Sequence, residues 1–352
     1  MTSSTAASSS PAATRHWIKI LANYRTPDRV RSIAELAITL LPFALLWALC
    51  SVAIHYGLWW GLLLIVPAAG FLLRLFIIQH DCGHGAFFGH RRADDWTGRV
   101  IGVLTLTPYD YWRRCHAHHH ATTGNLAQRG LGDILTLTVD EYLGRSRWGR
   151  LRYRIYRNPI VLFGFGPAWL FFFEQRLPIG LMRAGPGPWL SAVLTNLGIV
   201  VLSLLLIWLV GLVPFLLIHL PIVMIAASLG VWLFYVQHQF EETCWMDGAD
   251  WEFQEAALHG SSHYVLPKIL RWFSGNIGVH HVHHLSSKVP YYRLPEVLRD
   301  HPDLADIGRI TIPESFSTVR LTLWSADRRK LISFKDALAG REGGQREPSL
   351  VG

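Results

Sequence analysis

Residues 36–73 read LAITLLPFALLWALCSVAIHYGLWWGLLLIVPAAGFLL and contain no Asp, Glu, Lys or Arg. Because an α-helix rises about 1.5 Å per residue, these 38 positions would form about 57 Å of helix, which is enough to cross a bilayer core twice. His55, Tyr56 and Gly57 lie near the middle and offer a turn. The stretch therefore predicts a hairpin of two transmembrane helices, over residues 34–54 and 58–79.

A second uncharged stretch covers residues 189–240, and the sequence GLVP at 211–214 divides it near its centre. It predicts a second hairpin, with spans over residues 189–211 and 215–237. Only 16% of the chain is charged, against roughly 25% in an ordinary soluble domain, and 51% is hydrophobic. The composition therefore excludes a water-soluble globule and favours an all-α integral membrane protein with four transmembrane helices in two hairpins.

Two further apolar stretches, residues 100–108 and 160–173, are too short or too interrupted to span a bilayer. We expect them to lie along the membrane surface as interfacial helices. The alternative is that residues 160–173 form a fifth, distorted span, which would place the histidine clusters described below on opposite sides of the membrane.

The net charge of +8 indicates an orientation. In the four-span topology one side of the membrane carries nearly all the basic loop residues, so the positive-inside rule makes that side cytoplasmic. We expect a cytoplasmic helical cap there, and a position in the bacterial inner membrane. The basic residues on this side are Arg25, Arg29, Arg31, Arg91, Arg92, Arg113, Arg114, the run at 145–157, Arg271 and Lys288.

We predict one membrane domain over residues 31–335, with a flexible tail on each side of it. Residues 1–30 begin with a Ser-, Ala- and Thr-rich segment that lacks the apolar core of a secretory signal, so we expect a flexible tail, with a transit peptide as the alternative. Residues 336–352 are rich in Gly, Arg and Glu and predict a second flexible tail. Four cysteines without CxxC spacing give no disulfide framework.

Ten of the 18 histidines fall into three clusters, HDCGH at 80–84, HAHHH at 116–120 and HHVHH at 280–284. Residues three and four apart share a helical face, so each cluster presents two or three imidazoles together. Neutral imidazole binds Fe, Zn, Cu and Ni, and eight ligands exceed one tetrahedral zinc but suit a site for two metal ions. The predicted ligands are His80, His84, His116, His119, His120, His280, His283 and His284.

Other residues near the clusters are candidates for supporting roles. His118 and His281 lie off the shared faces, and we interpret them as non-ligands that could donate hydrogen bonds to the ligand shell. Metal-bound imidazoles usually donate their second N–H to a carboxylate or carbonyl, which makes Asp81, Asp133, Asp247 and Glu252 candidates, with ordinary solvated acids as the alternative. His238, at the end of the fourth span, is the candidate ninth ligand, ahead of His259 and His263.

The three clusters, in this order and among two apolar hairpins, resemble the membrane fatty acid desaturase superfamily. Two sequence segments resemble bacterial relatives of delta-12 acyl-lipid desaturases: WRRCHAHHHATTGNL and GNIGVHHVHHLSSKVPYYRLPEVLRDHP. The similarity covers about residues 30–335. The resemblance implies a centre of two non-haem iron ions held by the eight histidines, with His238 as an addition. It also implies an oxidoreductase that uses O2 and two electrons to introduce a cis double bond into a long acyl chain.

The same resemblance implies partners. The acyl substrate would be carried by a membrane lipid or by coenzyme A, and no nucleic acid is involved. Because the sequence shows no haem-binding electron-carrier segment, the electrons would come from a separate ferredoxin or small haem cytochrome. Four arginines, Arg113, Arg114, Arg150 and Arg154, are candidates for binding lipid phosphates or an acidic donor, and topology signals explain them equally well.

Two other functions remain as alternatives. A hydroxylase or ketolase could use the same scaffold. A membrane metal-binding or transport protein would need ionisable residues inside the spans. The spans carry almost none, and Arg74, the exception, is expected to snorkel to the membrane surface. HDCGH lacks the glutamate of the HExxH motif, which disfavours a zinc metalloprotease.

Overall fold

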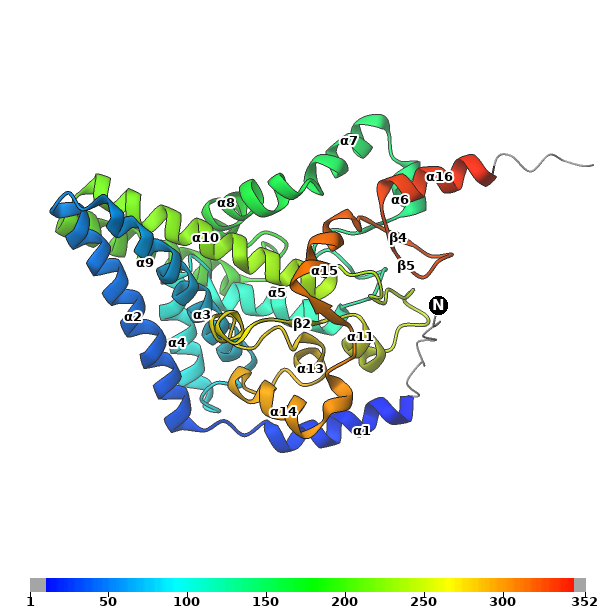
Figure 1. Ribbon diagram of the computed structural model, residues 1–352, viewed down its shortest axis with the longest axis horizontal. Helices are drawn as coiled ribbons and strands as arrows, with labels where there is room; N and C mark the ends of the chain where they lie inside the picture. Colours follow the sequence, from blue (N-terminus) through cyan, green and yellow to red (C-terminus); the bar gives the residue numbers. More distant parts are fainter. Residues whose placement is uncertain (1–10, 345–352) are drawn as a thin grey trace, which may run out of the picture.

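The computed structural model describes residues 11–344 and is mostly helical (Figure 1). Four of the described helical segments are long and apolar enough to cross a membrane: α2 (Arg29–His55), η2 with α3 (Trp59–His84), α9 (Pro186–Val210) and α10 (Leu212–His238). These segments coincide, within a few residues, with the four predicted spans. The prediction of four span-length helices is therefore confirmed.

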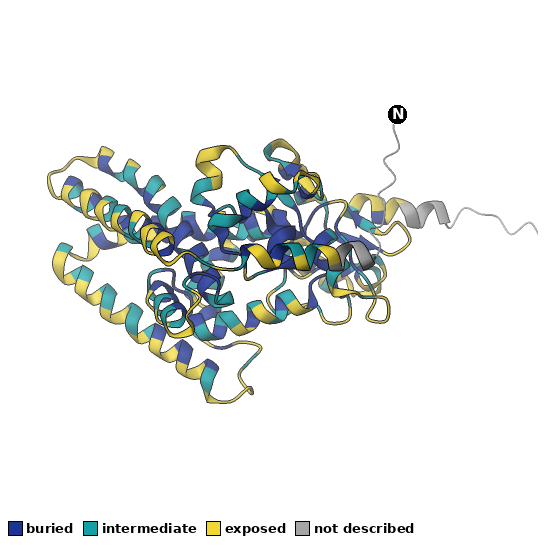
Figure 2. Cartoon of the chain, turned by 90° about the horizontal axis from the view of Figure 1, so that it is seen from below, coloured by how far each residue is buried: buried dark blue, intermediate teal, exposed yellow. Residues whose placement is uncertain are grey.

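Helix α3 (Ile65–His84) is the centre of the fold and packs against α2, α10 and α4. In its most apolar part 56% of the residues are buried, against 6% for α9. The outer faces of α2 and α9 are covered with exposed apolar side chains, such as Leu41, Leu204 and Trp208 (Figure 2). Such continuous apolar faces suit contact with lipid and not with water.

Arg74 does not reach the molecular surface, so the expectation that it snorkels is wrong. Its side chain is 2% exposed, and its guanidinium contacts the Glu35 carboxylate and the carbonyl of Trp272. Glu35, in α2, is equally buried and also accepts a hydrogen bond from Arg31 at 2.7 Å. A buried charge is tolerated only when it is paired, and here the pair joins the first two long helices.

We call the shorter helices between residues 91 and 320 the cap. They are α4 (Arg91–Leu104), α5 (Tyr109–Thr122), α6 (Val139–Gly144), α7 (Arg147–Tyr156), η3 (Val161–Phe165), α8 (Gly166–Phe172), η4 (Glu174–Arg176), α11 (Phe253–His259), α12 (Lys268–Phe273), α13 (His280–Leu285), η5 (Tyr291–Arg293), α14 (Leu294–Asp300), η6 (Pro302–Leu304), α15 (Ile312–Ser317) and η7 (Thr318–Arg320). Residues 160–173 fall mainly in η3 and α8, of 5 and 7 residues. These elements are too short to form a fifth span.

Two small sheets lie among the cap helices, and the prediction of an all-α fold did not include them. In the first sheet, β4 (Leu323–Ser325) lies between β1 (Leu137–Thr138), which is parallel to it, and β5 (Lys330–Ile332), which is antiparallel. In the second, β2 (His263–Val265) pairs in parallel with β3 (Arg309–Thr311). The β1–β4 and β2–β3 pairs join segments that are distant in sequence and so connect different parts of the cap, whereas β4 and β5 form a local hairpin.

Parts of the two predicted tails are helical. Within residues 1–30 the structure has α1 (Pro11–Leu21) and η1 (Ala22–Tyr24), while residues 1–10 lie outside the described residues. Leu21 is fully buried, and the Tyr24 hydroxyl donates to Asp300 Oδ2 at 2.9 Å. Near the other end, α16 (Phe334–Gly344) begins before the predicted boundary, and residues 345–352 are not described.

Candidate metal centre

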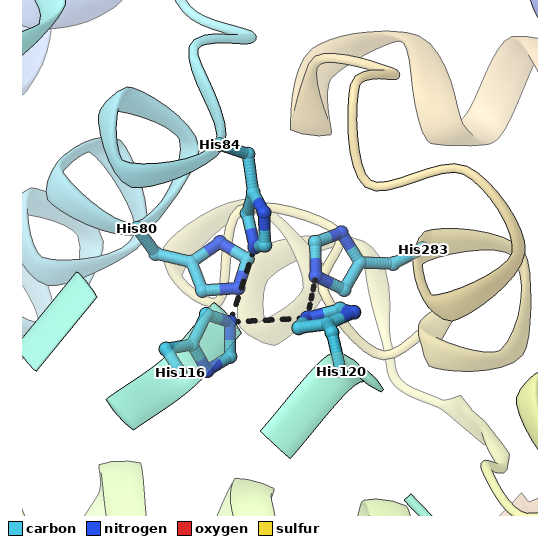
Figure 3. Close-up of side chains that lie close together, drawn as sticks. All are labelled: His80, His84, His116, His120 and His283. Atoms are coloured by element: carbon cyan, nitrogen blue, oxygen red, sulfur yellow. Dashed lines mark hydrogen bonds between the residues drawn. The ribbon is translucent and has the colours of Figure 1, made fainter. Parts of the chain in front are cut away.

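Nine histidines from four helices converge in the cap. Their imidazoles form two groups, and within each group the nitrogen atoms that could bind a metal ion lie within 4.8 Å of one another. The five-histidine group, whose side chains point toward one another in Figure 3, contains His80, His84, His116, His120 and His283. The four-histidine group contains His119, His238, His280 and His284. These are the eight predicted ligands from the three motifs and the predicted ninth, His238.

The helices place each imidazole through their register. His80 and His84 lie at the end of α3, which continues past the apolar stretch until Gly85 takes a left-handed conformation (φ +67°). His238 is the last residue of α10. These two long helices therefore end close together, and their last histidines belong to the two histidine groups.

Helices α5 and α13 each serve both groups. In α5, His116 and His120 belong to the five-histidine group, whereas His119 belongs to the other. In α13, His283 joins the five-histidine group and the remaining two ligand candidates join the four-histidine group. Sequence spacing predicted a shared face for each motif, and the structure divides that face between two neighbouring sites.

Short contacts between Nε2 atoms define each group. These distances are 3.1 Å for His84–His116, His116–His120, His120–His283 and His280–His284, 3.0 Å for His238–His280, and 3.2 Å for His119–His238. Imidazole nitrogen atoms that bind one ion at about 2.0–2.1 Å, as in zinc sites, lie about 2.9–3.3 Å apart, depending on the angle between them. The spacing in both groups therefore fits metal coordination.

Hydrogen bonds at the opposite ring nitrogens support the same conclusion. His119 Nδ1 donates to Asp133 Oδ1 at 2.5 Å, and His238 Nδ1 donates to the Gly260 carbonyl at 3.3 Å. In a neutral imidazole this leaves Nε2 with a lone pair and no proton. Two such lone pairs face each other at 3.2 Å, an arrangement that a cation between them would stabilise.

The carboxylates divide into two that contact the groups and two that do not. Asp133 holds His119 as described, and Asp81 Oδ1 lies 3.2 Å from His80 Nδ1. Asp247 and Glu252 are exposed at the surface, as solvated acids would be. The predicted role of orienting an imidazole thus fits Asp81 and Asp133 alone.

The other histidine candidates lie outside both groups. His281 is buried, but its Nε2 donates to the Leu304 carbonyl at 2.8 Å, so this hydrogen bond holds the end of η6 and not a ligand candidate. His263 Nδ1 donates to the Ala305 carbonyl at 2.6 Å, and His259 lies 3.7 Å from Glu255. His118 is half-buried on the side of α5 away from the groups.

Burial favours the neutral form of five imidazoles of the centre. It lowers the pKa of each cap histidine in the two groups for which a shift is resolved far below its usual value, and the neighbouring imidazoles lower it further; these residues are His116, His120, His280, His283 and His284. A neutral imidazole is the form that binds metals. The donor set, nitrogen throughout, suits Fe, Zn, Cu or Ni and disfavours Mg or Ca.

Aromatic side chains contact the centre. The Trp112 ring stacks on His116, with ring centroids 4.6 Å apart and an interplanar angle of 14°. Phe234 lies 5.1 Å from His119 and 5.0 Å from His238. These rings contact imidazoles of both groups and help to fix their orientations.

A polar network that the sequence reasoning missed connects the centre to the long helices. The backbone N–H of Tyr291 donates to Asp81 Oδ2 at 2.7 Å, and its hydroxyl lies 3.2 Å from Glu35 Oε2 and 3.3 Å from Arg74 Nη2. A signal was present, because Glu35 and Arg74 flank the uncharged stretch 36–73 with opposite charges. The two ends of an antiparallel hairpin lie at the same depth, so such flanking residues meet.

Comparison with known proteins places these features in a family. The sequence model of the family described as fatty acid desaturase matches residues 57–313, which include all nine histidines. A protein named fatty acid desaturase from Bacillus subtilis (strain 168) is 43% identical over 317 residues, 90% of each chain. Two proteins from Synechocystis are each 28% identical: an sn-1 oleoyl-lipid 12-desaturase, over 63% of each chain, and an sn-1 acyl-lipid omega-3 desaturase (ferredoxin), over 62% of this chain and 61% of that one.

Proposed function

This chain belongs to the fatty acid desaturase family, and on that premise we propose that it introduces a cis double bond into a long acyl chain, using O2, two electrons and two non-haem iron ions. The observation that carries the proposal is the division of nine histidines into two adjacent groups. Two ions bound side by side would be able to share the two-electron chemistry that removal of two hydrogens requires.

Each group has a defined part in this proposal. The five-histidine group would hold one iron ion and the four-histidine group the other, with Asp81 and Asp133 fixing the orientation of one imidazole in each. The bound iron pair supplies the O2-dependent oxidation of the unactivated C–H bonds. The chain itself favours the neutral form of the imidazoles and orients them, in part through Trp112 and Phe234.

The substrate and the electron donor follow from chemistry and from the relatives. Burial of an acyl chain stabilises a complex by about 0.8 kcal/mol per methylene group, so an apolar path to the centre would select the position of oxidation by depth. The two Synechocystis relatives are named as acting on acyl lipids, and one name includes ferredoxin. We infer a membrane-lipid acyl chain as substrate and a separate ferredoxin or small haem cytochrome as electron donor.

The membrane position is part of the same proposal. The span-length helices α3 and α10 both end in the centre, so all nine histidines lie at one end of the spans. The basic loops lie at this end in a topology of two hairpins, which by the positive-inside rule faces the cytoplasm of a bacterial inner membrane.

The test is expression of the full chain in a host whose lipids contain saturated and monounsaturated acyl chains. Gas chromatography of the host fatty acids should show new double bonds. His119→Ala and His283→Ala should each abolish these products and reduce the bound iron measured in the purified protein. His118→Ala is the matched control, because it removes an imidazole of the same motif outside both groups, and it should retain both properties.

Other products would overturn the proposal. Hydroxylated or keto fatty acids in place of new double bonds would indicate an oxygenase on the same scaffold. Full activity of His119→Ala or His283→Ala would refute the assignment of the two histidine groups.

A further inference from the structure

Helix α7 carries an arginine-lined hollow that contains none of the histidines of the metal centre. The hollow has a volume of about 310 Å³ and is lined by Tyr142, Arg147, Arg150, Leu151, Arg154 and Leu338. None of these lining residues is acidic. The hollow thus combines three positive charges with apolar walls.

The guanidinium group of Arg154 is held in place by two aromatic side chains. Arg154 Nε donates to the Tyr142 hydroxyl at 2.6 Å, and the guanidinium lies over the rings of Tyr142 and Phe334, at 5.9 and 5.3 Å. Tyr142 itself is 1% exposed, so this support is fixed. Among residues 16–339, whose side chains the structure describes, no carboxylate forms an ion pair with Arg147 or Arg150. The positive charge of the hollow is therefore not neutralised by the described part of the chain.

A stripe of exposed apolar side chains runs beside these arginines. Trp148, Leu151 and Ile155 are 75%, 44% and 51% exposed, and their spacing places them on one face of α7. Later in the chain, Phe165 in η3 and Trp169 in α8 are also exposed, at 70% and 62%. In Figure 1, α7 and α8 follow one another along one edge of the molecule, and α8 packs against the span-length helix α10.

This arrangement matches the boundary between lipid headgroups and acyl chains. Amphipathic helices with Trp and Leu on one face and arginine on the adjoining face lie in that boundary, where guanidinium groups meet lipid phosphates. We propose that the hollow binds the phosphate of an anionic phospholipid headgroup, while Trp148 and Leu151 insert among the acyl chains. An acidic soluble protein would satisfy the arginines but would leave the exposed apolar stripe in water.

The site does not depend on the proposed oxidation chemistry, and its test uses a different readout. The purified full chain is titrated in detergent with phosphatidylglycerol, phosphatidylcholine and inorganic phosphate, and bound ligand is counted by native mass spectrometry. The wild type should prefer phosphatidylglycerol over phosphatidylcholine, and salt should weaken the preference. Arg150→Gln should lower the affinity for phosphatidylglycerol about fivefold.

Arg152→Gln is the matched control. Arg152 lies on the same helix, is exposed, and does not line the hollow, so the variant has the same change in charge and should bind phosphatidylglycerol like the wild type. Unchanged thermal unfolding and iron content confirm that both variants are folded.

Three results would overturn the proposal. An equal loss of affinity in Arg150→Gln and Arg152→Gln would indicate general attraction by net charge. Binding of inorganic phosphate as tightly as phosphatidylglycerol would assign the hollow to a free anion. Absence of any headgroup preference, together with binding of an acidic electron-carrier protein that Arg150→Gln abolishes, would assign the surface to that protein class.

Discussion

Replacing either Glu35 or Arg74 alone should destabilise the protein more than replacing both. Their side chains are 4% and 2% exposed, and each is the other's ionic partner inside the bundle of long helices. Glu35→Gln leaves the Arg74 guanidinium buried with only neutral partners, which are the Trp272 carbonyl and the hydroxyls of Thr39 and Tyr291. Arg74→Met leaves Glu35 with Arg31, whose side chain is 59% exposed.

The magnitudes follow from this burial. An exposed ion pair contributes at most about 1 kcal/mol, whereas removing one partner of a buried pair costs about 3–5 kcal/mol. We expect each single variant in that range, with Glu35→Gln the more severe because Arg74 has no other carboxylate among its described contacts. The double variant leaves no unpaired buried charge and should cost about 2 kcal/mol or less. The coupling energy between Glu35 and Arg74 in this double-mutant cycle is then about 4 kcal/mol or more.

The cycle is measured by equilibrium unfolding of the four purified proteins in mixed micelles, followed by circular dichroism. Bound metal provides a second readout, because Tyr291 connects the pair to Asp81 and the single variants should lose metal more readily. Additive costs, with the double variant as unstable as the sum of the single ones, would refute the reasoning.

Three further changes test other parts of the fold. Asp133→Asn weakens the support of one imidazole, so metal titration should show an affinity about 10- to 100-fold lower; unchanged affinity contradicts this role. Burial raises the pKa of Asp94 from 3.8 to about 6. Stability should therefore fall as pH rises between these values, and the gain in thermal stability from Asp94→Asn should appear above pH 6 and vanish below 3.8. Gly98→Ala places a Cβ 2.2 Å from the Tyr109 ring and should cost about 1–3 kcal/mol in unfolding, whereas Gly164→Ala, with no atom within 4 Å, should change little.

The long helices could be predicted because an uncharged stretch has few alternatives in a membrane protein. Their ends could not, since the signals that begin and end a helix lie outside the apolar residues. Helix α2 begins at Arg29, five positions before the predicted start, because Asp28 caps it by accepting a hydrogen bond from the Arg31 N–H at 3.1 Å. The helical spacing of His80 and His84, by contrast, predicted that the second span extends past residue 79, and α3 does continue to His84.

The sequence also indicated which histidines belong to the metal centre. It did not indicate how they divide between the two groups. Spacing by helical turns identifies which imidazoles point to one side of α5, and it does not tell which of two sites each one reaches. That choice depends on the neighbouring helices, since His119 faces His238 from α10 while His116 faces His84 from α3. The short strands β2 and β3 could not be predicted either, because each three-residue strand is defined by its pairing with a segment distant in the chain.

The sharing of α5 and α13 between the two histidine groups has a consequence for how the protein matures. In the proposed two-ion centre, filling one group would fix the rotation of both helices and thereby bring the imidazoles of the other group into place, so the second ion should bind more tightly than the first. At limiting metal supply, a population of this protein should therefore consist of fully loaded and empty molecules, with few that carry a single ion. Assembly of the centre would be all-or-none, which would limit the number of half-built sites that could react with oxygen unproductively.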